Sequence, residues 1–66
     1  MEVVLNGERR QVPEGLNLES LLQHLQIKSE RVAIEHNRRI VKREDWPKVQ
    51  VQAGDELEIV HFVGGG

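Results

Sequence analysis

Four leucines at helical spacing define one long amphipathic helix, and nothing else in this chain predicts a second. They are Leu18, Leu21, Leu22 and Leu25. These positions are i, i+3, i+4 and i+7, which lie on one face of a helix. Asn17 is well suited as the N-cap because its side chain accepts a hydrogen bond from a free backbone N–H. The pattern predicts a helix over roughly Leu18 to Ile27.

The opening stretch from Met1 to Val12 predicts a β-hairpin. Apolar residues at positions 1, 3 and 5 recur with the period of two that is typical of a strand. Asn6-Gly7 follows, and this dipeptide readily adopts the positive φ angles of a type I′ turn. We therefore expect the chain to return as a second strand that ends at Val12.

Alternation returns after the helix, with Val32 and Ile34 on one face of a further strand. Two more strands are predicted at Arg39 to Lys42 and at Leu57 to Val63. Between them the stretch EDWPK can form about one turn of 3₁₀ or α helix, because Pro47 prevents a longer one.

The predicted order is strand, strand, helix, strand, strand, final strand. A ferredoxin-like fold needs two long helices, and this chain has one. The first and last strands most naturally lie side by side in the middle of one sheet, joined by a crossover that contains the helix. We therefore expect an α+β, β-grasp (ubiquitin-like) fold with a mixed sheet of four to five strands. Residues 1–63 are expected to form a single domain, and residues 64–66 a flexible glycine tail.

The composition excludes several classes of function. With a net charge of −2 and 3% aromatic residues, the chain has no basic stripe with which to bind nucleic acid. No apolar run approaches the ~20 residues of a membrane span, and the start lacks a signal-peptide pattern. The absence of cysteine excludes disulfides and suits a reducing cytoplasm. We therefore expect a cytoplasmic protein with no nucleic acid and no membrane partner.

No set of residues in the chain predicts catalysis or metal binding. The histidines His24, His36 and His61 fall on different elements and lack ligand spacing. The sequence also lacks a Ser/His/Asp set, a P-loop and a GxGxxG motif. Trp46 is expected to cover the core. We therefore expect no catalytic residue, no metal and no tightly bound cofactor, and a protein that is not itself an enzyme.

The last strand is expected to present a docking surface. Leu57 and Ile59 alternate toward the core, so Val60 and Phe62 fall on the opposite face. We expect both to be exposed beside Val4, and an exposed apolar patch marks an interaction site. Docking of the folded body would also offset the entropy lost when a partner orders the tail, about 1–2 kcal/mol per residue.

The chain ends in three glycines, Gly64, Gly65 and Gly66, which bring no side chain to a core. Two interpretations stay open. The tail is an inert end, such as the remnant of a tag, or it enters a narrow channel of another protein where any Cβ atom would clash. In the second case the α-carboxylate at the tip would be the reactive group, once a partner had activated it with ATP.

Several stretches along the whole chain resemble the ThiS sulfur carriers of thiamin biosynthesis. They are VVLNGE near the start, IVKREDW (Ile40 to Trp46), GDELEIVHFV (Gly54 to Val63) and the terminal Gly-Gly. The chain is also similar, more distantly, to MoaD-type and other ubiquitin-like carriers. The combination is more specific than the Gly-Gly end alone.

The resemblance implies a function for the tail. Gly66 would be adenylated by a ThiF-like, E1-related adenylyltransferase that uses ATP, and a sulfur-donor system would convert it to a thiocarboxylate. A ThiG-like thiazole synthase would then accept the sulfur. The family requires two glycines, so if processing trims the third, Gly65 rather than Gly66 would be the reactive residue. Two other functions stay open: a MoaD-like carrier for molybdopterin or another pathway, and a ubiquitin-like interaction module with an inert tail.

Overall fold

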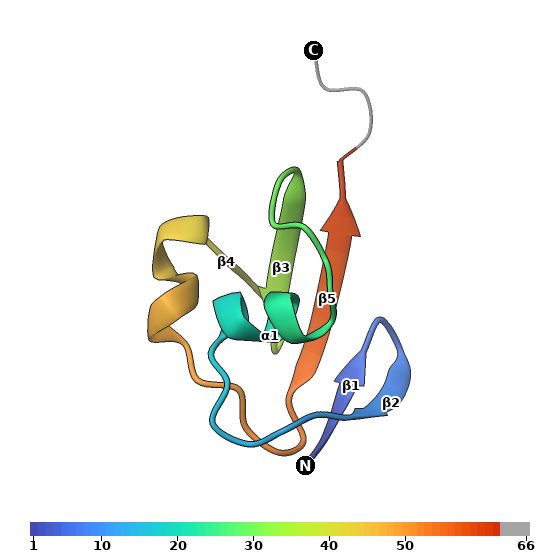
Figure 1. Cartoon of the computed structure of the whole chain (residues 1–66). Coiled ribbons are helices and arrows are strands. Elements are labelled where there is room, and N and C mark those ends of the chain that lie inside the picture. Colours follow the sequence, from blue (N-terminus) through green and yellow to red (C-terminus); the bar gives the residue numbers. More distant parts are fainter. Residues whose placement is uncertain (63–66) are drawn as a thin grey trace.

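The computed structural model describes residues 1–62, which form a five-stranded mixed sheet with one α-helix against one face (Figure 1). The elements are β1 (Glu2–Leu5), β2 (Glu8–Gln11), α1 (Leu18–His24), β3 (Val32–His36), β4 (Arg39–Val41), the 3₁₀ helix η1 (Arg43–Lys48) and β5 (Glu56–His61). The strand order is β2-β1-β5-β3-β4, with β1 and β5 parallel and the other pairs antiparallel. The predicted β-grasp arrangement, with the first and last strands adjacent, is confirmed.

The hairpin turn at Asn6 also fastens the hairpin to β5. Asn6 and Gly7 have φ angles of 49° and 82°, as a type I′ turn requires. The Asn6 side chain accepts a hydrogen bond from the Ile59 N–H at 2.7 Å and donates one to the Ile59 carbonyl at 3.3 Å. Its amide group therefore continues the pairing of β1 with β5 beyond the end of β1.

Helix α1 begins at the predicted N-cap. The Asn17 side chain accepts a hydrogen bond from the Ser20 N–H at 2.8 Å, and Ser20 Oγ accepts one from the Asn17 N–H at 2.9 Å. This reciprocal capping box satisfies two backbone donors that the first turn leaves free. The cap is also tied to the rest of the fold, because Asn17 forms a β-bridge with Gln50.

The helix ends at His24, three residues before the predicted Ile27. Gln26 adopts a left-handed φ of 59°. The Gln26 N–H bonds to the Gln23 carbonyl, and the Ile27 N–H to the Leu22 carbonyl. These two bonds form a Schellman motif, which usually has glycine at the left-handed position. The glutamine there gave no sequence signal, so the prediction was three residues too long.

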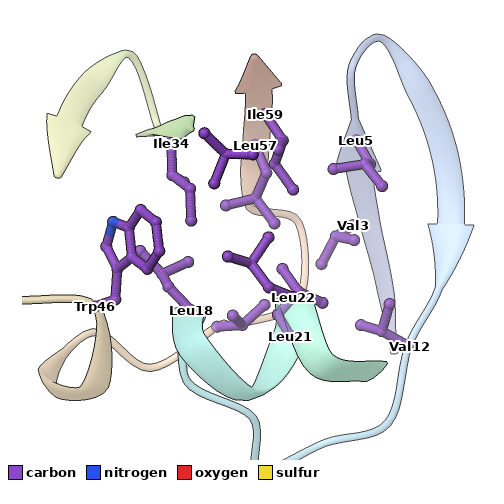
Figure 2. Packing of buried hydrophobic residues seen from close by; sticks show 12 residues of the cluster. Val3, Leu5, Val12, Leu18, Leu21, Leu22, Ile34, Trp46, Leu57 and Ile59 are labelled. Carbon is purple, nitrogen blue, oxygen red and sulfur yellow. The ribbon is translucent and has the colours of Figure 1, made fainter. Parts of the chain in front are cut away.

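The core lies between α1 and the inner face of the sheet (Figure 2). The buried hydrophobic residues are Val3, Leu5, Val12, Leu18, Leu21, Leu22, Val32, Ile34, Trp46, Val51, Leu57 and Ile59. Trp46, from η1, closes one end of this core with only 2% of its surface exposed, and its indole N–H bonds to the Val41 carbonyl at 2.9 Å. The predicted role of Trp46 as a cover of the core is confirmed.

A buried carboxylate fixes the start of β5. Asp55, 8% exposed, accepts hydrogen bonds from the Gln52 N–H and His36 Nε2, both at 2.8 Å, and from Asn37 Nδ2 at 3.2 Å. Burial alone would raise the pKa of Asp55, but the bonds from Gln52, His36 and Asn37 outweigh it, so the pKa is lowered. The charged form of Asp55 therefore stabilises the fold.

Acid is expected to weaken the fold through Asp55. Since the pKa of Asp55 is lower in the folded state, the stabilisation is complete above the unfolded value, about 3.8, and is lost as the pH falls through the folded value. Asp55→Asn should cost about 1–3 kcal/mol at pH 7, because one amide oxygen cannot replace two carboxylate oxygens. It should also flatten the loss of stability below about pH 4. Urea unfolding followed by Trp46 fluorescence from pH 7 to 2 measures both effects.

The exposed Glu14 offers a matched carboxylate for comparison. Glu14→Gln should keep the stability and acid profile of the parent chain. If the free energy of unfolding of Asp55→Asn fell with pH in parallel with that of the parent chain, the result would contradict the role of the Asp55 charge.

Candidate functional site

Strand β5 presents an apolar surface on the face of the sheet away from α1. Its alternation places Leu57 and Ile59 in the core, 1% and 5% exposed, while Val60 and Phe62 are 49% and 57% exposed. The predicted exposure of Val60 and Phe62 is confirmed. His61 is also exposed, at the end of β5.

The outer face also holds Ile40, which the sequence reasoning missed. Ile40 is the most exposed large hydrophobic residue of the described chain, at 75%. It lies opposite Glu35, and Ala33, next to Glu35 on that face, lies opposite Val60. We call Ile40, Val60 and Phe62 the outer patch. Strand β4 has only three residues, too few to show an alternation of apolar and polar positions. The apolar side chain of Ile40 was therefore the one indication in the sequence.

Val4, on β1, lies apart from the outer patch, beside the start of β5. It is half-buried and pairs with Glu56, four positions before Val60, so the two residues do not lie directly side by side. Val4 instead lines a shallow hollow of about 260 Å³ together with Glu35 and Glu58. The outer face thus has an apolar end near Phe62 and an acidic part near Val4, and Ile40, which lies opposite Glu35, borders the acidic part.

The acidic part carries an unfavourable pair. Glu35 and Glu58 lie directly opposite each other on β3 and β5, and like charges in this position destabilise a sheet. Arg38 offers a partial countercharge, with its Nε atom 3.7 Å from a carboxylate oxygen of Glu56. A partner with basic groups beside an apolar surface would complement this face.

The end of β5 is held by the loop before β3. The Phe62 N–H bonds to the Arg31 carbonyl at 2.7 Å, one position beyond the pair Val32 and His61. Phe62 is therefore still anchored to the centre of the sheet. The candidate residues of the tail, Gly64, Gly65 and Gly66, lie outside the described residues.

Other candidate sites receive little support from residues 1–62. His24, His36 and His61 lie on separate elements, and no three His, Asp or Glu side chains of this part gather as a metal requires. The helices within the same range are too short and too polar to cross a bilayer.

Comparison with known proteins connects this architecture to a family. The model of the ThiS family matches residues 3–66. The sulfur carrier protein ThiS of Escherichia coli is 30% identical over 66 residues, which cover all of both chains. The crystal structure of the thiamine biosynthesis protein ThiS from Geobacter metallireducens is 35% identical, with a TM-score of 0.89 and full coverage of both chains.

A second kind of relative is much longer. The thiazole synthase of Paramagnetospirillum magneticum is 44% identical over the 66 residues of this chain. The chain spans 20% of the length of that protein. A segment similar to the whole of this chain is therefore one part of a larger polypeptide there.

Proposed function

The chain belongs to the ThiS family and is similar to proteins named as sulfur carriers, and we propose that Gly66 carries sulfur as a thiocarboxylate for the thiazole of thiamin. The observation that carries this proposal is the match along the full length of both chains to a sulfur carrier. That match extends through the glycines at the end of the sequence.

The position of β5 supports a tail that reaches outward. β5 lies between β1 and β3, and Phe62 is bound at the end of this central strand. Residues 63–66 would span about 13–14 Å if fully extended. Three of these four residues are glycines and could pass through a channel too narrow for side chains. The folded body can then remain outside the partner.

The chemistry would be supplied by a partner. In the first step a carboxylate oxygen of Gly66 attacks the α-phosphate of ATP, pyrophosphate leaves, and an acyl-adenylate forms. In the second step sulfide from a donor attacks the acyl carbon, AMP leaves, and a thiocarboxylate remains. The carrier contributes the reactive carboxylate and the surface that presents it, and a ThiF-like, E1-related adenylyltransferase contributes the ATP site.

The proposed acceptor of the sulfur is a ThiG-like thiazole synthase. The support is the thiazole synthase from P. magneticum, in which a segment similar to this chain belongs to the same polypeptide. A carrier that is covalently joined to a synthase acts at a high effective concentration. A separate carrier must instead dock, and we propose that Val60 and Phe62, with Val4 at the edge of the acidic hollow, provide that surface.

Intact mass spectrometry tests the proposed function. The chain is incubated with the adenylyltransferase, ATP and a sulfide donor, and fragmentation locates any change. We expect one oxygen-to-sulfur exchange at Gly66, and none in a chain whose C-terminus is an amide. No exchange in the parent chain would favour an interaction module with an inert tail. Exchange found only in a chain that has lost Gly66, at the new terminal carboxylate, would identify Gly65 as the reactive end.

Truncation of Phe62 is expected to weaken docking more than folding. Loss of an aromatic anchor in an interface costs more than ~1 kcal/mol, so we expect the KM for adenylation of Phe62→Ala to rise roughly tenfold. Because Phe62 is 57% exposed, stability should change by less than about 0.5 kcal/mol. Steady-state kinetics and thermal unfolding measure the two effects.

Phe62→Leu is the matched variant for this experiment, because it keeps most of the apolar surface. Its KM should stay close to that of the parent chain. A large loss of stability in Phe62→Ala with an unchanged KM would place Phe62 in the core and remove it from the docking surface.

A further inference from the structure

We propose that Arg43 is a positioning residue for the tail, because it holds the loop to which Phe62 is bound. This inference rests on the proposed function, since it concerns how the reactive terminus is presented. Arg43 lies in η1, far in sequence from both the loop and the end of β5. Two contacts connect it to the base of the tail, and a third anchors it to the buried Trp46.

The first contact joins β5 to the loop. The Phe62 N–H bonds to the Arg31 carbonyl at 2.7 Å. Arg31 has a left-handed φ of 58°, a conformation that residues other than glycine rarely adopt. Such a conformation persists only where its surroundings hold it. The position of the carbonyl that receives Phe62 thus depends on what restrains the loop.

The second contact restrains that loop. The Arg43 guanidinium donates a hydrogen bond from Nη2 to the Ser29 carbonyl, two residues before Arg31. Residues 28–31 are exposed, so the loop has little buried surface of its own to fix it. A bond from outside the loop is therefore an important restraint.

The third contact anchors Arg43 to the core. Its Cζ atom lies 5.1 Å from the centre of the Trp46 ring, and Trp46 is 2% exposed. Arg43 makes no ion pair with any carboxylate of residues 1–62. A planar guanidinium can stack on an aromatic ring while its N–H groups, which lie in the plane, donate to a carbonyl. The residue type therefore matches the two contacts.

This chain of contacts connects the buried Trp46 to the last anchored residue before the tail. If Arg43 is removed, the loop is released and Phe62 loses a fixed acceptor. Val60 stays paired with Ala33 on the sheet and the Phe62 side chain is still present, so we expect docking to be kept while the direction in which the tail leaves the body varies. Reacting groups need closely defined positions, so we expect the rate of the chemical step to fall while binding is kept.

Hydrogen exchange tests the structural part of the proposal without any partner. In Arg43→Ala we expect the Phe62 amide to exchange about tenfold faster, as follows from the loss of one hydrogen bond and one cation–π contact. The Val12 amide, bound to the Met1 carbonyl at the other side of the sheet, should keep its rate. Arg10→Ala, which removes an exposed arginine of β2, should change neither amide.

Pyrophosphate release from ATP with the adenylyltransferase tests the functional part. We expect kcat of Arg43→Ala to fall about tenfold with little change in KM, which is the opposite pattern from Phe62→Ala. Arg43→Lys keeps a cation and a donor, so it should recover part of the rate. It also serves as the test if Arg43→Ala unfolds, because it should still exchange faster than the parent at Phe62.

The possible results separate the inference from the proposed function. An absence of pyrophosphate release by the parent chain would refute the proposed function, and exchange at Phe62 would still decide whether Arg43 holds the loop. Unchanged exchange at Phe62 in both Arg43 variants overturns the positioning role. Faster exchange with a normal kcat overturns it as well, because the loop would then not matter for the reaction.

Discussion

A variant without Gly65 and Gly66 is expected to lose sulfur transfer completely while its thermal unfolding stays the same. Under the proposed function the reacting atom belongs to the carboxylate of Gly66. Deletion moves the carboxylate back by two residues, about 7 Å of extended chain. A reacting group must lie within a few ångströms of its target, so the shortened tail cannot reach the phosphate of ATP.

Stability should be unaffected because the buried hydrophobic residues of the described chain lie between Val3 and Ile59. The two deleted glycines contribute no apolar side chain to this core. We expect a change of less than about 0.5 kcal/mol, or roughly 2–4 °C for a domain of this size. Circular dichroism measures unfolding, and intact mass spectrometry measures the gain of sulfur.

Gly66→Ala is the matched variant for the deletion. It keeps the length of the chain and its carboxylate but adds one Cβ atom. The comparison therefore distinguishes a tail that is too short to reach ATP from a tail that is too wide for the channel. If the channel is as narrow as the glycines imply, this variant should react slowly and the deletion variant not at all. Sulfur gained by the deletion variant would show that the reactive group is elsewhere, and a large fall in its melting temperature would show that the tail is packed.

The sequence predicted best those features that depend on neighbouring residues. The turn at Asn6 and Gly7 and the cap at Asn17 both follow from side chains that act within a few positions. The exposure of Val60 and Phe62 follows from the period of two in a single strand. The end of α1 was predicted less well, because Gln26 adopts a conformation that its residue type does not favour.

Contacts between distant residues could not be predicted. The hydrogen bonds of Asn6 reach 53 positions to Ile59, and the bond from His36 reaches 19 positions to Asp55. Such pairs depend on register and on the meeting of two turns, which a pattern within one segment does not contain. For the same reason the sequence placed Val4 beside Val60, whereas the parallel register sets it beside Glu56.

The candidate site contains residues that a local pattern predicts and residues whose position depends on distant contacts. The alternation toward the end of the chain indicated which residues face outward, so two of the three residues of the outer patch, Val60 and Phe62, were found. Ile40 was missed because its place depends on the pairing of β4 with β3, and Arg43 because its partner Ser29 lies 14 positions away. A single sequence predicts which residues of one strand share a face. Which residues of two strands become neighbours is known only once the sheet is assembled.

Replacement of Trp46 by alanine is expected to remove most of the stability of the fold. Trp46 is the largest of the fully buried side chains, and Figure 2 shows it at one end of the core beside Leu18 and Ile34. Truncation of a buried Trp costs about 3–5 kcal/mol. At the usual 0.05–0.15 kcal/mol per residue, a chain of this length has a total of roughly 3–10 kcal/mol. We therefore expect the melting temperature to fall by at least ~15 °C, or the fold to be lost.

Far-UV circular dichroism is the suitable measurement, because Trp46 is the only tryptophan and its fluorescence disappears with it. Ile40→Ala is the matched control, since it truncates a large apolar residue that is 75% exposed and should change stability by less than about 0.5 kcal/mol. Trp46→Phe keeps a ring but leaves the Val41 carbonyl without its donor, so it should lie between the two. Equal melting temperatures for Trp46→Ala and Ile40→Ala would mean that η1 covers the core without stabilising it. That result would also contradict the role proposed for Arg43, because a Trp46 ring that is not firmly packed cannot fix the position of Arg43 and, through it, the loop that receives Phe62.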